Sequence, residues 1–189
     1  MIRLRLRRDD GFTLTEMIAA AAIFSLVSLA LGGVMISITN AQAQVTTSTS
    51  ATSMAQATAD SIDSGVRNAS ALNLEASGSD QLLVAKVAGA GTTLTWHCRG
   101  WFYSSSDGGK IWMTQTADGT KITVPDAAEL ASWTLLVDGV TPSSGSTVFT
   151  RSGSSVEVGF LVAVTGTSPV QMDFTTTSLL GVSEDASCF

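Results

Sequence analysis

Few residues in this chain of 189 are of the types that carry enzymatic or metal chemistry. The chain has a single histidine, His97, and two cysteines, Cys98 and Cys188. A zinc site or a Ser-His-Asp triad needs further residues at defined spacing, and the sequence has no second histidine and no C-x-x-C motif. We therefore expect no catalytic residue, no metal site and no cofactor, and we expect that the protein is not an enzyme.

One carboxylate, Glu16, stands at an unusual place. It lies in the stretch RDDGFTLTEM, at the mouth of an apolar run, and no charged residue follows from Met17 to Ile38. A helix over that run would be about 33 Å long, enough to cross a hydrocarbon core of roughly 30 Å. Because a charge within a membrane segment is costly, it usually has a partner. The position predicts a specific partner for Glu16.

The charges around the apolar run predict its orientation in a membrane. Four arginines precede the run, and arginine-rich flanks stay in the cytoplasm. We expect a single-pass protein of the cytoplasmic (inner) membrane, with its N-terminus inside and the residues after about 40 outside. The arginines are Arg3, Arg5, Arg7 and Arg8.

Three general interpretations compete for this segment. A Sec signal peptide is favoured by an A-x-A site at Ala41–Ala43, but the apolar run exceeds the usual 7–15 residues and Glu16 interrupts its start. A twin-arginine signal would use Arg7 and Arg8, whose surroundings match that pattern poorly. A plain membrane anchor explains the length of the run but leaves Glu16 without a role.

The string G-F-T-L-T-E-M, followed by the apolar run, resembles the processing site of type IV prepilins and type II secretion pseudopilins. The resemblance covers about residues 5–40. It implies that a basic leader ends at Gly11, that a membrane peptidase cuts between Gly11 and Phe12, and that Phe12 is then N-methylated. Thr15 departs from the aliphatic residue that is frequent in the family, and Gly32-Gly33 stands where many pilins have a proline.

The resemblance also suggests what Glu16 pairs with. Cleavage would create a positive amine on Phe12, and Glu16 of one subunit can pair with the Phe12 amine of another as helices bundle into a filament. A desolvated pair of this kind is strongly destabilised when one partner is lost. The alternative is a plain anchor in which Glu16 reaches the interface.

The resemblance implies as partners a prepilin peptidase/methyltransferase, other pilin subunits, an inner-membrane assembly platform and, before assembly, membrane lipid.

Composition limits the remaining functions. The chain has a net charge of −6, and residues 1–11 carry +2, which leaves −8 for the rest. An acidic body argues against a broad phosphate-binding surface, so no direct nucleic-acid binding is expected. The apolar content of 44% is enough for a core.

The sequence predicts four segments: a leader at 1–11, a transmembrane and assembly helix at 12–39, the outer half of that helix at 40–76, and a β-rich head at 77–189. The outer half is indicated by apolar residues every three or four positions. Its stretch QVTTSTSATS is a poor helix former, so helix continuity there stays open. The periodic residues are Ala55, Ala59, Ile62, Val66, Ala69 and Leu72.

After residue 80 the pattern becomes strand-like, with turn signals at 106–109 and 117–120. The first turn predicts a hairpin, the segments STVFTR and VEVGFLVAV predict a second, and VQMDFTTTSL predicts a last strand with alternating apolar residues. Residues 126–130 suggest a short helical turn. The expected fold class is α+β and pilin-like: a long N-terminal α-helix packed on a C-terminal antiparallel β-sheet domain.

The two cysteines have two possible states. In an exported chain they suggest one disulfide, and a Cys98–Cys188 bond would pin the C-terminal tail to the sheet. The resemblance agrees, because many pilins carry a disulfide near the C-terminus. Free buried thiols are the alternative.

The expected function is that of a structural subunit, and more specifically a minor one, of a type IV pilus or a type II secretion-like pseudopilus. The alternative is a secreted or membrane-anchored module that binds glycans or mediates surface adhesion through tryptophans. Packing of those tryptophans in the core is the favoured interpretation. They are Trp96, Trp101, Trp112 and Trp133.

Overall fold

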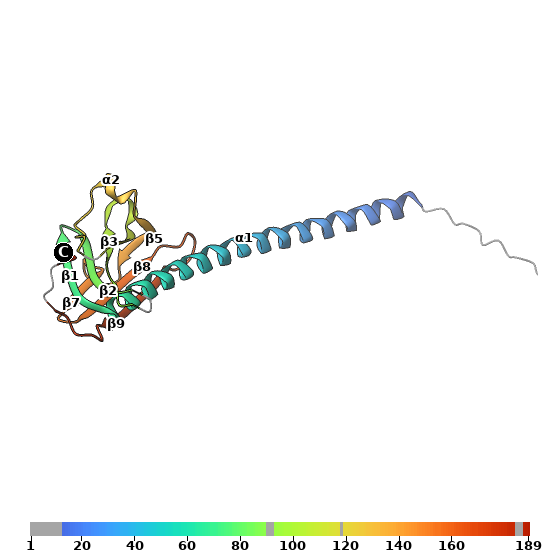
Figure 1. Ribbon diagram of the computed structural model, residues 1–189. Helices are drawn as coiled ribbons and strands as arrows, with labels where there is room; N and C mark the ends of the chain where they lie inside the picture. Colours follow the sequence, from blue (N-terminus) through green and yellow to red (C-terminus); the bar gives the residue numbers. More distant parts are fainter. Residues whose placement is uncertain (1–12, 90–92, 118, 184–186) are drawn as a thin grey trace, which may run out of the picture. The chain divides into compact units, whose positions relative to one another are not determined.

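The computed structural model describes residues 13–89, 93–117, 119–183 and 187–189 (Figure 1). It consists of two units, residues 1–43 and residues 44–189, and from here on we use the word head for the second unit, which is longer than the head of residues 77–189 predicted from the sequence. Helix α1, Leu14–Arg67, starts in the first unit and ends in the second. The predicted cleavage residues Gly11 and Phe12 lie outside the described residues.

The first part of α1 has an apolar surface on all sides. Every residue from 14 to 43 is exposed, including large side chains such as Phe24, which is 74% exposed. The hydroxyls in this part bond within the helix: Ser25 Oγ donates to the Ala21 carbonyl at 2.8 Å, and Thr39 Oγ1 donates to the Ile36 carbonyl at 2.9 Å. These bonds satisfy polar groups that would be costly in an apolar medium.

The second part of α1 stays helical through its threonine-rich stretch, although the residues there have a low intrinsic helix propensity. Thr52 Oγ1 and Thr58 Oγ1 donate to the carbonyls four residues earlier, at 2.9 and 2.8 Å. One face of this part is buried in the head, and tertiary packing of this kind overrides weak propensity. The buried residues are Ala51, Ala55, Thr58, Ala59, Ile62, Gly65 and Val66.

The predicted extent of the helix is wrong at its C-terminal end, because α1 stops at Arg67 and not at residue 76. Asn68 closes the helix, donating both its backbone N–H and its Nδ2 to the Ser64 carbonyl at 3.3 and 2.9 Å. Residues 69–77 then form strand β1, Ala69–Ser77, which pairs with β2, Asp80–Ala88, through a turn at Gly78. A short apolar run fits a helical or an alternating period equally well, and strand pairing decided between them.

The larger sheet is antiparallel with five strands in the order β1-β2-β3-β4-β5. The short 3-10 turn Ser106–Gly108 joins β3 to β4 and confirms the first predicted hairpin. Strand β5 was not predicted. The further strands of this sheet are β2 (Asp80–Ala88), β3 (Trp96–Ser104), β4 (Lys110–Ala117) and β5 (Thr134–Asp138).

The second sheet is antiparallel and centred on β8, which pairs with β6 and β7 on one edge and β9 on the other. The predicted second hairpin and last strand are confirmed as β7–β8 and β9, whereas β6 was not predicted. The strands are β6 (Val140–Pro142), β7 (Phe149–Ser152), β8 (Ser155–Val162) and β9 (Val170–Thr177).

The larger sheet buries side chains on both faces. On one face, Trp101 from β3 lies against Gly65 of α1 and donates its Nε1 to Ser61 Oγ at 3.0 Å. This face also contacts the second sheet through buried Gln81, whose Nε2 donates to the Phe149 carbonyl at 2.8 Å and whose Oε1 accepts from Val148 N–H at 2.7 Å.

The other face carries a smaller apolar cluster, composed of Leu82, Val84, Cys98, Phe102, Ile122 and Cys188. Trp112 and Trp133 flank it, with both ring centroids 6.3 Å from that of Phe102. Helix α2, Ala127–Leu130, lies in the connection after β4 and starts with a capping box between Asp126 and Glu129, which confirms the predicted helical turn. The α+β, pilin-like fold class predicted from the sequence is confirmed.

Candidate functional site

The start of α1 is organised by Glu16. Its Oε2 accepts a hydrogen bond from the Thr13 backbone N–H at 3.0 Å and from Thr13 Oγ1 at 2.9 Å. In return, the Glu16 N–H donates to Thr13 Oγ1 at 3.4 Å. This reciprocal pair is a capping box, which satisfies two donors that a helix start leaves free. Glu16 therefore holds the first turn of the apolar helix in place within a single chain.

The capping role of Glu16 was not predicted, although the sequence contains its signal. Thr13 and Glu16 are three residues apart and stand directly before an apolar run, and S/T-x-x-E at such a place is the pattern of a capping box. The observed cap and the predicted pairing with a Phe12 amine are compatible, because the cap leaves one carboxylate oxygen available. In the described part of the chain, all hydrogen bonds of the Glu16 carboxylate involve Oε2.

Within the described residues, α1 is the one helix long and apolar enough to cross a membrane. Its first part presents no polar stripe that would face water, unlike a surface helix of a soluble domain. This property fits anchoring in a membrane, as the sequence predicts.

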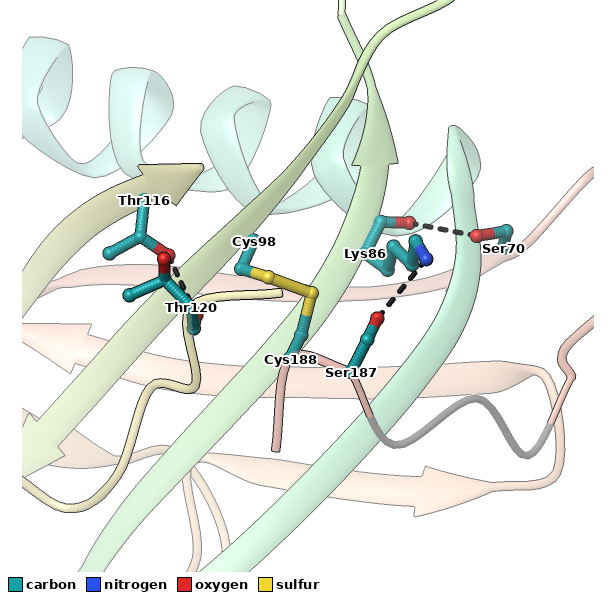
Figure 2. Close-up of a disulfide and its surroundings, with 7 residues drawn as sticks. All are labelled: Ser70, Lys86, Cys98, Thr116, Thr120, Ser187 and Cys188. Carbon is teal, nitrogen blue, oxygen red and sulfur yellow. Dashed lines mark hydrogen bonds between the residues drawn. A yellow bond between two sulfur atoms is a disulfide. The ribbon is translucent and has the colours of Figure 1, made fainter. Parts of the chain in front are cut away.

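The C-terminal tail is fixed to the larger sheet by a disulfide between Cys98 on β3 and Cys188 (Figure 2). Their Cα atoms are 5.4 Å apart, both residues are buried, and 90 positions separate them in sequence. The Ile122 N–H donates to the Cys188 carbonyl at 2.9 Å, so the tail also fixes the connection after β4. The predicted bond is present, and the alternative of free thiols is excluded in this structure.

Hydrogen bonds extend this attachment along the tail. Figure 2 shows Lys86 on β2 donating its Nζ to Ser187 Oγ, at 3.1 Å. Upstream, the Ser183 N–H donates to the Ser70 carbonyl at 2.8 Å, and the Leu179 N–H donates to the Arg67 carbonyl at 3.0 Å. The tail therefore connects the end of α1, the start of β1 and the middle of the sheet.

The tryptophans do not form an exposed platform. Trp101 is fully buried under α1, and Trp112 and Trp133 are partly buried around Phe102. The Lys86 ammonium lies over the Trp96 ring in a cation–π contact, with Lys86 Nζ 5.7 Å from the centroid of the ring. These positions agree with the core-packing interpretation.

His97 and the cysteines do not assemble a metal site. Cys98 is bonded to Cys188, and no cluster of three or more His, Cys, Asp or Glu that could hold a metal ion is found among the described residues. The capped start of α1 and its apolar first part make the N-terminal segment the candidate functional site.

Comparison with known families supports that focus. The family model of the prokaryotic N-terminal methylation motif matches residues 6–32, a range that includes Gly11, Phe12 and Glu16. No curated protein and no solved structure matches the chain.

The match and the fold together define what the chain resembles: it carries the signature of proteins that are processed as prepilins, and its long helix followed by antiparallel sheets is a pilin-like layout. More particularly, it carries the N-terminal methylation motif that type IV pilin-like and pseudopilin-like prepilins share.

Proposed function

We propose that this protein is a structural subunit, and specifically a minor subunit, of a type IV pilus or a type II secretion-like pseudopilus. The observation that carries the proposal is the methylation motif at residues 6–32, which leads directly into a helix whose apolar surface is exposed in its own chain. In this proposal the chain acts by assembly and not by catalysis.

The proposed sequence of events starts in the membrane. A prepilin peptidase removes residues 1–11, Phe12 is methylated, and residues 12–39 hold the subunit in the inner membrane with the head outside. An inner-membrane assembly platform then brings the helix together with those of other pilin subunits. The motif and the apolar helix support the membrane stage, because filament packing and lipid both require an apolar surface.

Glu16 has a double role in this proposal. Before assembly, its Oε2 caps the helix through Thr13. During assembly, the carboxylate pairs with the Phe12 amine of a neighbouring subunit, without giving up the cap. A pair formed in such apolar surroundings is screened little by water, so it can select the register in which one helix joins the next.

A minor role is proposed because the head is large and acidic. Its two sheets, α2 and the disulfide-bonded tail build a body of 146 residues that begins at Gln44. Such a body would present a specialised surface, and it carries most of the chain's negative charge.

The test separates charge from capping with two variants of the full-length protein. Glu16→Gln keeps an oxygen that can accept from Thr13 but removes the charge, and Thr13→Ala keeps the charge but removes the hydroxyl of the cap. We expect both to be cleaved and inserted normally. Incorporation into sheared filaments, normalised to the membrane pool, should fall at least about tenfold in Glu16→Gln, because 1.4 kcal/mol already gives that factor.

Thr13→Ala serves as the matched control and should incorporate nearly as well as the wild type, since a lost cap costs about 1 kcal/mol of helix stability only. Wild-type incorporation of Glu16→Gln would contradict the electrostatic role. An equal defect in both variants would contradict a role that is specific to the charge of Glu16.

A further inference from the structure

A polar cleft opens on the head where α1 ends beside the larger sheet. Its volume is about 410 Å³, within the range of small-ligand sites. The end of α1, the end of β2 and the neighbouring strands β3 and β4 line it. Its polar side chains are Ser64, Asn68, His97, Arg99 and Gln115.

Of the described residues that line the cleft, Arg99 is the one with a permanently charged side chain, and Gln115 holds it in position. Its Nε and Nη2 both donate to Gln115 Oε1, at 3.2 and 2.8 Å. A guanidinium has five N–H groups, so two on Nη1 and one on Nη2 remain, and no hydrogen bond from these is found within the described residues. One N–H of Nη1 and the remaining N–H of Nη2 form an end-on pair of donors of the kind that binds both oxygens of a carboxylate.

Among the described residues, no counter-charge to Arg99 lines the cleft. No aspartate or glutamate that the structure describes is part of its lining. Within the described part of the chain, the ion pair that is formed joins Arg67 to Asp63 and does not involve Arg99. Arg99 is half-buried, and this burial lowers the pKa of its guanidinium because the charged form loses solvation. A bound anion would compensate for that loss.

The end of α1 works against an anion, since the C-terminal end of a helix carries a partial negative charge. Asn68 reduces this effect by donating its backbone N–H and its Nδ2 to the Ser64 carbonyl at the rim of the cleft. The full positive charge of Arg99 then exceeds the remaining partial charge.

We propose that this cleft binds a small carboxylate ligand, such as an acidic sugar, whose carboxylate is held end-on by Arg99. Gln115 fixes the guanidinium plane, while His97 and Ser64 offer polar contacts to the rest of the ligand. This site differs from the tryptophan surface considered from the sequence, and it does not depend on the assembly function proposed above.

The test uses the full-length protein in detergent micelles, with sodium glucuronate as the probe and glucose as its neutral counterpart. Calorimetric titration should show saturable binding of glucuronate in the millimolar range, as expected for one bidentate contact, and at least about tenfold weaker binding of glucose. Absence of saturable glucuronate binding, or equal binding of glucose, would overturn the proposal.

Two variants locate the binding. Arg99→Gln should weaken glucuronate binding at least about tenfold, whereas Arg151→Gln, which removes the same charge from an exposed arginine elsewhere on the head, should leave it unchanged. Equal losses in both would show that only the net charge matters and would contradict a site. Unchanged glucuronate binding in Arg99→Gln would also contradict the proposed site.

Gln115→Glu covers the case in which Arg99→Gln fails to fold. This change places a side-chain carboxylate next to the Arg99 guanidinium, at the position where Gln115 already bonds to Arg99. We expect the variant to fold, because it turns a neutral contact into an ion pair, and to lose glucuronate binding at least about tenfold. Wild-type binding in Gln115→Glu would overturn the proposal.

Discussion

The two parts of helix α1 have the same secondary structure and opposite surroundings. Residues 14–43 expose large apolar side chains in every direction, whereas the part from Ala51 to Val66 buries a face of small and branched residues. Gly33 in the first part and Gly65 in the second show the contrast most directly. A Cβ on Gly65 would overlap Trp101 Cη2, but a Cβ on Gly33 would meet no atom within 4 Å.

This contrast shows that the two parts depend on different partners. The second part is stabilised by its own head, so substitutions there should change the free energy of unfolding. Within the described part of the chain the first part has no such packing, so its apolar surface is available for lipid and, in the proposed function, for other subunits. Substitutions there should change insertion and assembly and leave the head unaffected. The following three predictions test this division.

The largest expected effect is that of Trp101→Ala. The ring is fully buried between α1 and the sheet and donates to Ser61, so its removal should lower the free energy of unfolding of the head by about 3–5 kcal/mol. Chemical denaturation of the protein in detergent, followed by circular dichroism, measures the change. Phe24→Ala is the control, and we expect no shift of the head's transition from it. A shift of similar size in both would contradict the division.

A somewhat smaller effect is expected on removing the disulfide. The double variant Cys98→Ala and Cys188→Ala should destabilise the head by about 2–4 kcal/mol, because a loop closed across 90 positions loses much freedom in the unfolded chain. The released tail should also become sensitive to protease near its C-terminus. Resistance equal to that of the wild type would mean that the hydrogen bonds at Ser187 and Ser183 suffice to hold the tail.

The smallest expected effect is at the two glycines. Gly65→Ala should destabilise the head by about 1–3 kcal/mol, since the new methyl group overlaps the Trp101 ring. Gly33→Ala should leave unfolding of the head unchanged and strengthen its own helix by about 1 kcal/mol, because alanine is the better helix former. Denaturation curves of the two variants, measured under the same conditions, give the comparison. Identical curves would contradict the division between the two parts of α1.

Much of the fold was predictable because local signals agreed with tertiary packing. The local signals were turn residues and the alternation of apolar and polar residues. They predicted the turn at 106–109, the β7–β8 hairpin and the strand at 170–177. The end of α1 was not predictable in the same way, since Ala69 and Leu72 fit both periods and only pairing with β2 made them a strand. Strands β5 and β6 are short and gain their pairing from neighbours distant in sequence.

The functional residues divide similarly. The cysteine pair was suggested by a count of two in a chain that the sequence predicts to be exported, and the processing motif by residues that are adjacent in sequence. The cap at Thr13 and Glu16 had a local signal that went unused. The cleft at Arg99 had none, because Ser64, Arg99 and Gln115 come together only when α1, β3 and β4 pack.

The central claim is that the chain is processed as a prepilin, and the mass of the mature N-terminal peptide tests it most directly. We predict that the membrane-bound protein begins at Phe12 and carries one added methyl group, and that replacing Gly11 with a bulky residue leaves the leader in place. A mature protein that begins at Gln44, after the A-x-A site, would contradict the claim, because residues 12–39 would then be a discarded signal peptide and not an assembly helix.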